Sequence, residues 1–186
     1  MNDNPEIIVI GGSSGSIPVV IRIIRDLPEG FSIPVVLIIH RMKNVESDLK
    51  RILSVTKNII EPEDKDPIKS GRIYLAPQNY HLLVEEDKTF SMDYSEPVNY
   101  SRPSIDVTFD SVSAVFGNRA LAILLSGANK DGAGGMVNIV ANGGAGIVQD
   151  PSSAEYPVMP QSVLKNNTAV EILTPENIVL KLLSLK

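Results

Sequence analysis

Three residues that together could form a serine hydrolase site follow apolar runs of the sequence. Ser13 lies in the loop GGSSGS, His40 follows the run PVVLII, and Asp131 lies in SGANKDGAGG after the run LAILL. A serine hydroxyl needs a general base to become a nucleophile, histidine is the usual base, and an aspartate can fix the tautomer of the imidazole. We therefore take Ser13, His40 and Asp131 as candidates for a catalytic triad in the order Ser, His, Asp.

The spacing of apolar residues predicts that these side chains share one edge of a sheet. The run Ile7–Ile10 is short and β-branched, and Pro18 opens the helical pattern that follows it. The run Val35–Ile39 is also apolar throughout and leads into the helical spacing of ESDLKRILSV. Such runs are typical of a parallel sheet covered by helices on both faces, and the carboxyl ends of its strands lie together. Ser13 and His40 should therefore be neighbours.

The rest of the chain continues this alternation with one interruption. Two β-like runs in HLLVEEDKTFSMDY flank a charged turn and predict a hairpin. From residue 104 the pattern resumes with a helix closed by Gly117, a strand in LAILL, a helix in DGAGGMVNIVANGG, and a final helix from Pro175. We expect an α/β fold: one domain over residues 1–186, a three-layer α/β/α sandwich around a mainly parallel sheet, with a β-hairpin.

The composition argues against several other classes of protein. The net charge of −5 and the lack of a basic block do not favour a nucleic-acid partner. With no cysteine, two histidines and scattered carboxylates, we expect no metal and no cofactor. The longest apolar runs are far below the roughly 20 residues that span a bilayer, and the start MNDNPE lacks a basic segment. We therefore expect a cytoplasmic protein without stable membrane insertion.

Each candidate residue also has a plainer interpretation. The loop GGSSGS could hold a phosphate or a dinucleotide, although the GxGxxG and GxxxxGK[ST] patterns are absent and His40 stands where a ribose-binding carboxylate is expected. An isolated His40 would be a hydrogen-bonding residue at a strand end. Asp131 could cap the helix that begins in GAGGM, alone or in addition to its catalytic role. His81 has no obvious carboxylate partner and is expected at the surface or behind the site.

In combination, the motifs resemble the catalytic domain of CheB-type protein-glutamate methylesterases over nearly the whole chain. The matching pieces, in the order of that family, are IVIGGSSGS, VVLIIHRM, GRIYLAPQNYHLLVE, NYSRPSIDVTFDSVSAVFG, LAILLSGANKDGAGGM, NGGAGIVQD and YPVMPQSV. The resemblance implies a parallel α/β sheet and a chemotaxis enzyme that hydrolyses glutamyl methyl esters of chemoreceptors, often with deamidation of certain glutamines. Methanol or ammonia would be the product.

The resemblance also assigns roles to individual residues. It implies that Ser13 is the nucleophile, His40 the base and Asp131 the third member of the triad. Ala128 corresponds to the residue whose backbone N–H helps to bind the oxyanion, and Ser14 is the second oxyanion candidate. Met159, in the piece YPVMPQSV, is grouped with the oxyanion and substrate-binding residues.

Departures from the family pattern lie around the expected site. Ser16 replaces a glycine, Ala128 a methionine and Lys130 an asparagine, and Arg41 follows the histidine directly. The family usually carries an N-terminal receiver domain. Met1 lies only a few residues before the first predicted strand, so we expect the catalytic domain without that receiver domain.

The expected partner is the methylated cytoplasmic region of a chemoreceptor. Arg41, Lys43 and Lys130 are predicted to rim the site, where they could attract an acidic receptor surface. Two other hypotheses remain open. One is a hydrolase of a small ester or of another acylated protein, and the other is a catalytically silent module that holds an anion or a nucleotide.

Overall fold

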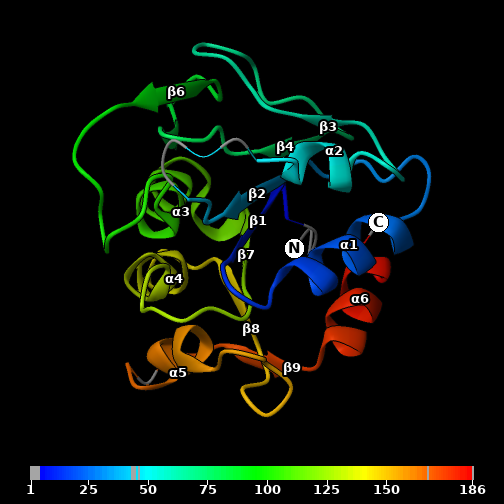
Figure 1. The fold of residues 1–186 in the computed structure, drawn as a ribbon, viewed down its shortest axis with the longest axis vertical. Coiled ribbons are helices and arrows are strands. Elements are labelled where there is room, and N and C mark those ends of the chain that lie inside the picture. Colours follow the sequence, from blue (N-terminus) through cyan, green and yellow to red (C-terminus); the bar gives the residue numbers. More distant parts are fainter. Residues whose placement is uncertain (1–4, 43–44, 46, 167, 186) are drawn as a thin grey trace.

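The computed structural model describes residues 5–42, 45, 47–166 and 168–185 as a sheet with helices on both faces (Figure 1). All strand pairs in this sheet are parallel. Its strands are, in spatial order, β3 (Ile59–Ile60), β4 (Ile73–Leu75), β2 (Val35–Ile39), β1 (Ile7–Gly12), β7 (Ala120–Leu124), β8 (Ala145–Gln149) and β9 (Glu171–Leu173). The predicted parallel α/β sheet is confirmed.

The two faces of the sheet form two apolar cores. Strand β1 is buried along its whole length, and Ile8 and Ile10 enter one core while Ile7 and Val9 enter the other. The helices on the first face are α1 (Ile17–Asp26), α2 (Leu49–Leu53) and α6 (Pro175–Leu183), and those on the second are α3 (Ile105–Phe116), α4 (Ala133–Ala141) and α5 (Val158–Leu164). Figure 1 shows α1 and α6 across the sheet from α3 and α4, which confirms the three-layer arrangement.

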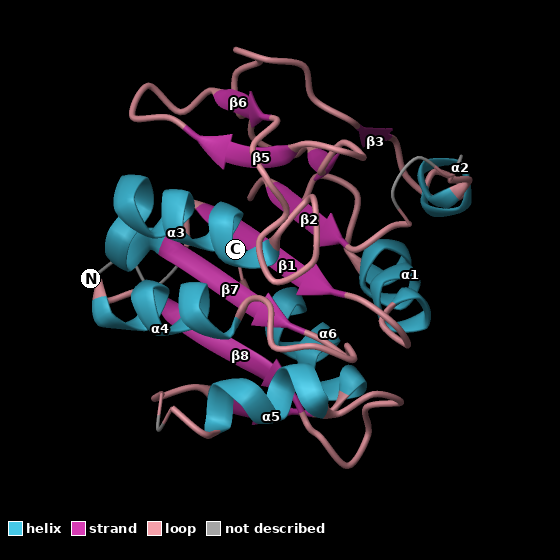
Figure 2. Cartoon of the chain, turned by 60° about the vertical axis from the view of Figure 1, so that its left-hand side comes forward, coloured by secondary structure: helices cyan, strands magenta, loops and turns pink. Residues whose placement is uncertain are grey.

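The predicted hairpin is also present. Strands β5 (His81–Val84) and β6 (Phe90–Asp93) pair antiparallel, and Figure 2 shows them alongside α3. Two hydrogen bonds fasten the hairpin to this helix: Thr108 Oγ1 donates to the Leu82 carbonyl at 2.7 Å, and the Val84 N–H donates to Ser111 Oγ at 3.0 Å. The hairpin therefore extends the layer that α3 forms on this face of the sheet.

Some elements are shorter than the sequence pattern indicates. Of the described residues in the helical spacing of ESDLKRILSV, only those of α2 are helical; the helix ends at Leu53 with Ser54 as its C-cap, before the β-branched Val55 and Thr56. A 3-10 turn, η1 (Gly117–Arg119), follows α3, where Gly117 ends the helix as predicted. Within the described residues, each helix is too short or too polar to cross a membrane.

The three central strands end side by side, which brings the loops with chemical side chains together. Gly12 at the end of β1 pairs with Ile39 of β2, and the His40 N–H donates to the Gly12 carbonyl at 3.1 Å. On the other side of β1, the Leu125 N–H donates to the Gly11 carbonyl at 2.9 Å. The loops after β1, β2 and β7 therefore meet at one edge of the sheet, as predicted.

Helices α3 and α4 pack closely at Gly135. A Cβ added to this glycine would lie 2.5 Å from the Phe109 Cβ and 3.1 Å from the Asp106 carbonyl oxygen. A Cβ added to the adjacent Gly134 would have its nearest neighbour, Asp106 Oδ1, at 3.4 Å, which is an ordinary contact. The two neighbouring helical glycines therefore differ in the space beside them.

We predict opposite effects of alanine at these two positions. Gly135→Ala should lower the free energy of unfolding by about 1–3 kcal/mol, because the helices must move apart. Gly134→Ala, the matched control, should leave it unchanged or raise it by up to about 1 kcal/mol, because alanine favours a helix. Urea unfolding followed by circular dichroism measures both. Equal effects would contradict the close packing of α3 and α4.

Candidate active site

Ser13 stands directly after β1 in a tight turn. Its N–H donates to the Ser126 carbonyl at 2.9 Å, and its carbonyl accepts from the Ser16 N–H at 3.0 Å and from the Ser16 hydroxyl at 2.6 Å. Gly15 has a φ of +77°, and a Cβ there would lie 2.7 Å from Ser126 Oγ, so the turn requires glycine. These bonds hold the half-buried Ser13 beside the start of α1.

Both ring nitrogens of His40 have hydrogen-bond partners. Nε2 lies 2.8 Å from Asp131 Oδ2, and Nδ1 lies 3.2 Å from Ser101 Oγ. An ionised carboxylate can only accept, so the proton of the neutral ring belongs on Nε2 and the lone pair on Nδ1. Nδ1 is therefore the atom that can take up a proton. The His40 N–H bond to the Gly12 carbonyl places the backbone of His40 beside the end of β1, one residue before Ser13.

Asp131 is completely buried and its carboxylate is fully hydrogen-bonded. Its donors are, for Oδ1, Ser104 Oγ at 2.8 Å, Asn99 Nδ2 at 3.1 Å and Asp106 N at 3.2 Å, and, for Oδ2, Ile105 N at 2.7 Å and His40 Nε2 at 2.8 Å. Burial by itself would raise the pKa of Asp131, but the hydrogen bonds from His40 and the Ile105 N–H hold that pKa below its usual value. The carboxylate is therefore ionised at neutral pH.

The carboxylate of Asp131 also binds the first N–H groups of α3, those of Ile105 and Asp106. These groups have no partner inside the helix, and the positive end of the helix dipole favours an anion there. The plainer interpretation of Asp131, as the cap of the helix that begins in GAGGM, does not hold, because the N-cap of that helix is Gly132, which has no side chain to cap it. Helix α4 follows Gly132, whose φ is +87°, and its Gly135 N–H donates to Asp106 Oδ1 at 2.7 Å instead.

Asp106 is a second carboxylate beside Asp131, and Asn99 joins the two. The Asn99 amide donates to Asp106 Oδ2 at 2.7 Å as well as to Asp131 Oδ1. Burial raises the pKa of Asp106 to about 6; the Gly135 N–H opposes this shift and the charge of Asp131 adds to it. Neighbouring carboxylates thus have pKa values shifted in opposite directions.

Several polar residues around the triad candidates were not predicted from the sequence. Asn99, Ser101 and Ser104 all lie in the piece NYSRPSIDVTF, where a polar run directly before a helix was the only signal. Gln149, at the end of β8, is also buried, and its Oε1 accepts from the Ser126 N–H at 2.9 Å. It supports the loop that holds Ser13.

His81 is buried, so the expectation that it lies at the surface is wrong. The other expectation, a position behind the site, agrees with its contacts. Its Nδ1 accepts from the Ser104 N–H at 3.1 Å, and its Nε2 lies 3.1 Å from the Glu96 carbonyl, to which it donates. The hairpin places this ring against the residue that binds Asp131. His81 therefore supports Ser104 from behind.

The two oxyanion candidates, Ser14 and Ala128, are exposed at the same edge of the sheet. Ser126 connects their loops, since its hydroxyl donates to the Ser14 carbonyl at 2.8 Å and Gly127 and Ala128 follow it in the chain. Within the described residues, no hydrogen bond uses the backbone N–H of Ser14 or of Ala128. Both groups are therefore available to a ligand.

Met159 lies beneath the loop of Ala128 in the apolar core. It is completely buried, its N–H donates to the Gly127 carbonyl at 3.0 Å, and a Cβ added to Gly127 would lie 2.4 Å from Met159 Cε. The side chain supports the loop of Ala128 from the core. A contact between this side chain and a substrate, as predicted from the sequence, does not fit its burial.

The predicted rim of positive charge is only partly present. The Arg41 side chain is 6% exposed and is bound by Glu61 Oε1 at 2.9 Å and by the Ala76 carbonyl, so the expectation for Arg41 is wrong. Lys43 lies outside the described residues, and Lys130 is exposed.

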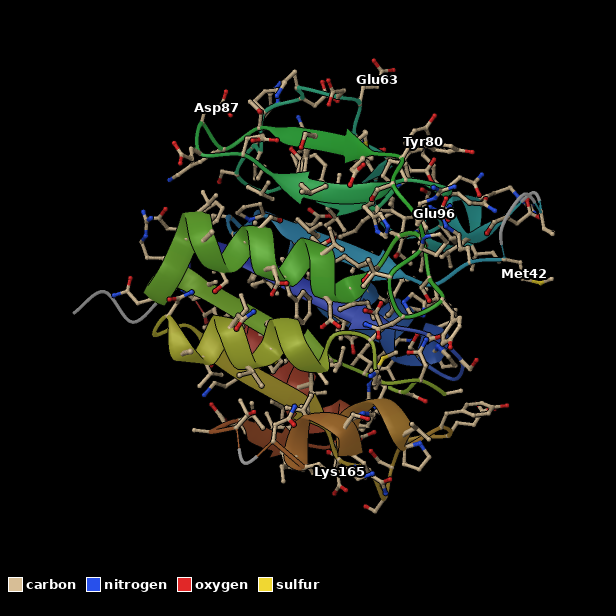
Figure 3. All side chains as sticks on the ribbon, turned by 90° about the vertical axis from the view of Figure 1, so that its left-hand side faces the viewer. Met42, Glu63, Tyr80, Asp87, Glu96 and Lys165 are labelled. Atoms are coloured by element: carbon tan, nitrogen blue, oxygen red, sulfur yellow. The ribbon has the colours of Figure 1, made fainter. Side chains whose placement is uncertain are left out.

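Figure 3 shows Met42, which is 73% exposed, on the same side of the molecule as the labelled Glu96. Within the described chain, no group of three or more side chains could hold a metal ion.

The raised pKa of Asp106 predicts a pH-dependent contribution to stability. The folded protein binds the proton of the Asp106 carboxyl more tightly than the unfolded chain does, where the pKa of this carboxyl is 3.8. Protonated Asp106 therefore contributes to the free energy of unfolding at low pH, and this contribution is lost as the pH rises through about 6. Relative to Asp106→Asn, the unfolding free energy of the unmodified protein should fall by about 1 kcal/mol between pH 5 and 7. Urea unfolding at both pH values tests this. A constant difference between the proteins would refute it.

Comparisons with known proteins agree with this geometry. Residues 8–182 match the CheB methylesterase family. A Leptospira interrogans relative is 45% identical over 177 residues, covering 94% of this chain and 92% of the relative. The Thermotoga maritima protein-glutamate methylesterase/protein-glutamine glutaminase is 31% identical over 185 residues, covering 97% of this chain and 54% of that protein. The crystal structure of the Thermotoga maritima CheB methylesterase catalytic domain superposes with a TM-score of 0.89 at 31% identity, covering 97% of each chain.

These similarities include the sheet and the loops at its edge. The chain spans nearly all of the Leptospira relative and about half the length of the Thermotoga protein, whose catalytic domain it matches almost completely. The matched residues contain Ser13, His40 and Asp131. The chain therefore belongs to the CheB methylesterase family.

Proposed function

We propose that this chain hydrolyses the methyl esters of glutamate side chains, with Ser13 as nucleophile, His40 as general base and Asp131 as the residue that orients His40. The observation that carries the proposal is the bond of His40 Nε2 to the buried, ionised Asp131, at the edge of the sheet where the His40 backbone is bonded to Gly12, the residue before Ser13. This bond leaves Nδ1 as the basic nitrogen. Membership of the CheB methylesterase family supports the same reaction.

The proposed reaction begins when His40 Nδ1 takes the proton of the Ser13 hydroxyl as Oγ attacks the ester carbonyl. The backbone N–H groups of Ser14 and Ala128 bind the oxyanion that develops. The Asp131 carboxylate stabilises the imidazolium, which then gives its proton to the departing methoxide and releases methanol. A water molecule, deprotonated by His40, hydrolyses the acyl-enzyme and frees Ser13.

The substrate that we propose is the methylated cytoplasmic region of a chemoreceptor, which places the enzyme in the cytoplasm. The names of the relatives include protein-glutamine glutaminase as well as methylesterase. The same acyl-enzyme would form from a glutamine amide, with ammonia as the leaving group. A single site could therefore perform both hydrolyses.

We predict that Ser13→Ala and His40→Ala each lower the turnover number at least about a thousandfold, and that the double variant is little worse, because the triad acts as a unit. The measurement is methanol release from a methylated receptor fragment. Ser152→Ala, a change at an exposed loop serine, is the matched control, and circular dichroism monitors folding. A folded Ser13→Ala protein with the parent rate would remove the proposed nucleophile.

We also predict a strong preference for a polypeptide over a free ester. A methyl group offers little surface, so the binding energy that orients the ester must come from the rest of the substrate. Release of radioactive methanol should therefore be at least about tenfold faster, as kcat/KM, from a receptor fragment than from glutamate γ-methyl ester. Equal values would favour a small-ester hydrolase, and no release from either would favour a silent binding module.

A further inference from the structure

The basic nitrogen of His40 is already occupied in this structure. Its partner is the hydroxyl of Ser101, at 3.2 Å, and not that of Ser13. Because Nε2 carries the proton, Ser101 must be the donor in this bond. The single lone pair of Nδ1 can accept one strong hydrogen bond, so a Ser13 hydroxyl that is to lose its proton must replace Ser101.

The two bonds of the ring differ in strength. The contact with Asp131 is 2.8 Å long, has a charged acceptor and is buried, whereas the contact with Ser101 is 3.2 Å long and joins neutral groups. Asp131 therefore fixes the ring, and the bond to Ser101 is the one that can exchange.

Ser101 belongs to a turn in which Asn99 is bound to the carboxylates of the site and Tyr100 is exposed to solvent. Ser101 and Val98 exchange backbone hydrogen bonds of 2.9 and 3.2 Å, and between them the Asn99 side chain binds the two carboxylates behind the site. Tyr100, next to Ser101, has a φ of +64° and is fully exposed. Because Tyr100 projects fully into solvent beside Ser101, a polypeptide that covers the site has far more surface with which to contact this turn than a small ester has.

We propose that Ser101 is a specificity-determining residue that competes with Ser13 for Nδ1 of His40 in the free protein, and that a bound polypeptide substrate shifts the competition toward Ser13. This inference rests on the proposed roles of Ser13 and His40. It predicts that this site reacts slowly with small esters. The hydroxyl of Ser101 lowers the fraction of molecules in which Nδ1 of His40 can accept the Ser13 proton. Only a substrate that contacts the turn raises that fraction again.

A small alkyl fluorophosphonate tests the competition, because it reacts without contacting the turn. In the labelling step the Ser13 Oγ–P bond forms, fluoride leaves and Nδ1 takes the serine proton. Ser101→Ala should label about two- to tenfold faster than the unmodified protein, the factor that corresponds to loss of one neutral hydrogen bond. Ser101→Thr keeps the hydroxyl and should restore the slow rate. Ser95→Ala, an exposed change in the same segment that removes only a bond to Asp93, is the matched control.

Peptide mapping of the label separates failure of this inference from failure of the proposed function. Label on Ser13 at equal or lower rate in Ser101→Ala overturns the competition alone. Label on Ser101, or no label on Ser13 in any variant, overturns the proposed nucleophile and the competition with it. In a second readout, Ser101→Ala should reduce the preference for a receptor fragment over glutamate γ-methyl ester, since the free ester gains more. A preference that stays the same or increases in a folded Ser101→Ala protein contradicts the proposal.

Discussion

The buried carboxylate of Asp131 is the interaction on which the rest of the site depends. A buried charge without partners costs several kcal/mol, so this carboxylate is stable only with donors on both oxygens. The donors come from His40 after β2, from the turn of Asn99, and from the start of α3 at Ser104, Ile105 and Asp106. One charge therefore joins three separate segments. The Asp131 carboxylate that binds the imidazole of His40 also binds the first N–H groups of α3. The fold and the proposed chemistry therefore both require this carboxylate to be ionised.

A second constraint is the pair formed by Asp131 and Asp106. Asn99 donates to both carboxylates, but their environments differ: Asp131 has helix N–H groups and His40, whereas Asp106 has fewer donors and lies beside the charge of Asp131. The pKa of one is lowered and that of the other is raised. This separation keeps the negative charge on the carboxylate next to His40. Because Asn99 bridges them, the pair also positions the turn that carries Ser101.

The sequence could predict the elements of the fold, because they follow from short-range patterns, and the ends of the predicted strands supplied the triad candidates. Apolar runs without alternation indicated a parallel sheet, and a parallel sheet gathers its strand ends, so the strands that precede Ser13 and His40 end side by side. Apart from His40, the partners of Asp131 lie 25 to 32 residues earlier in the chain, at and just before a helix start whose position across the sheet no local pattern gives. The burial of Met159 and the pairing of Arg41 with Glu61 are tertiary contacts of the same kind, which no local pattern gives, and the expectation of an Arg41 side chain at the rim failed for that reason.

The tautomer of His40 tests the central claim most directly, because the whole account assigns the proton to Nε2 and the lone pair to Nδ1. Long-range proton–nitrogen correlation spectra of the neutral ring distinguish the two tautomers. The account predicts a protonated Nε2 and an unprotonated Nδ1 in the unmodified protein, and loss of this single pattern in Asp131→Asn. A neutral His40 with its proton on Nδ1, or a pattern unchanged by Asp131→Asn, would contradict the claim that Asp131 determines which nitrogen is the base.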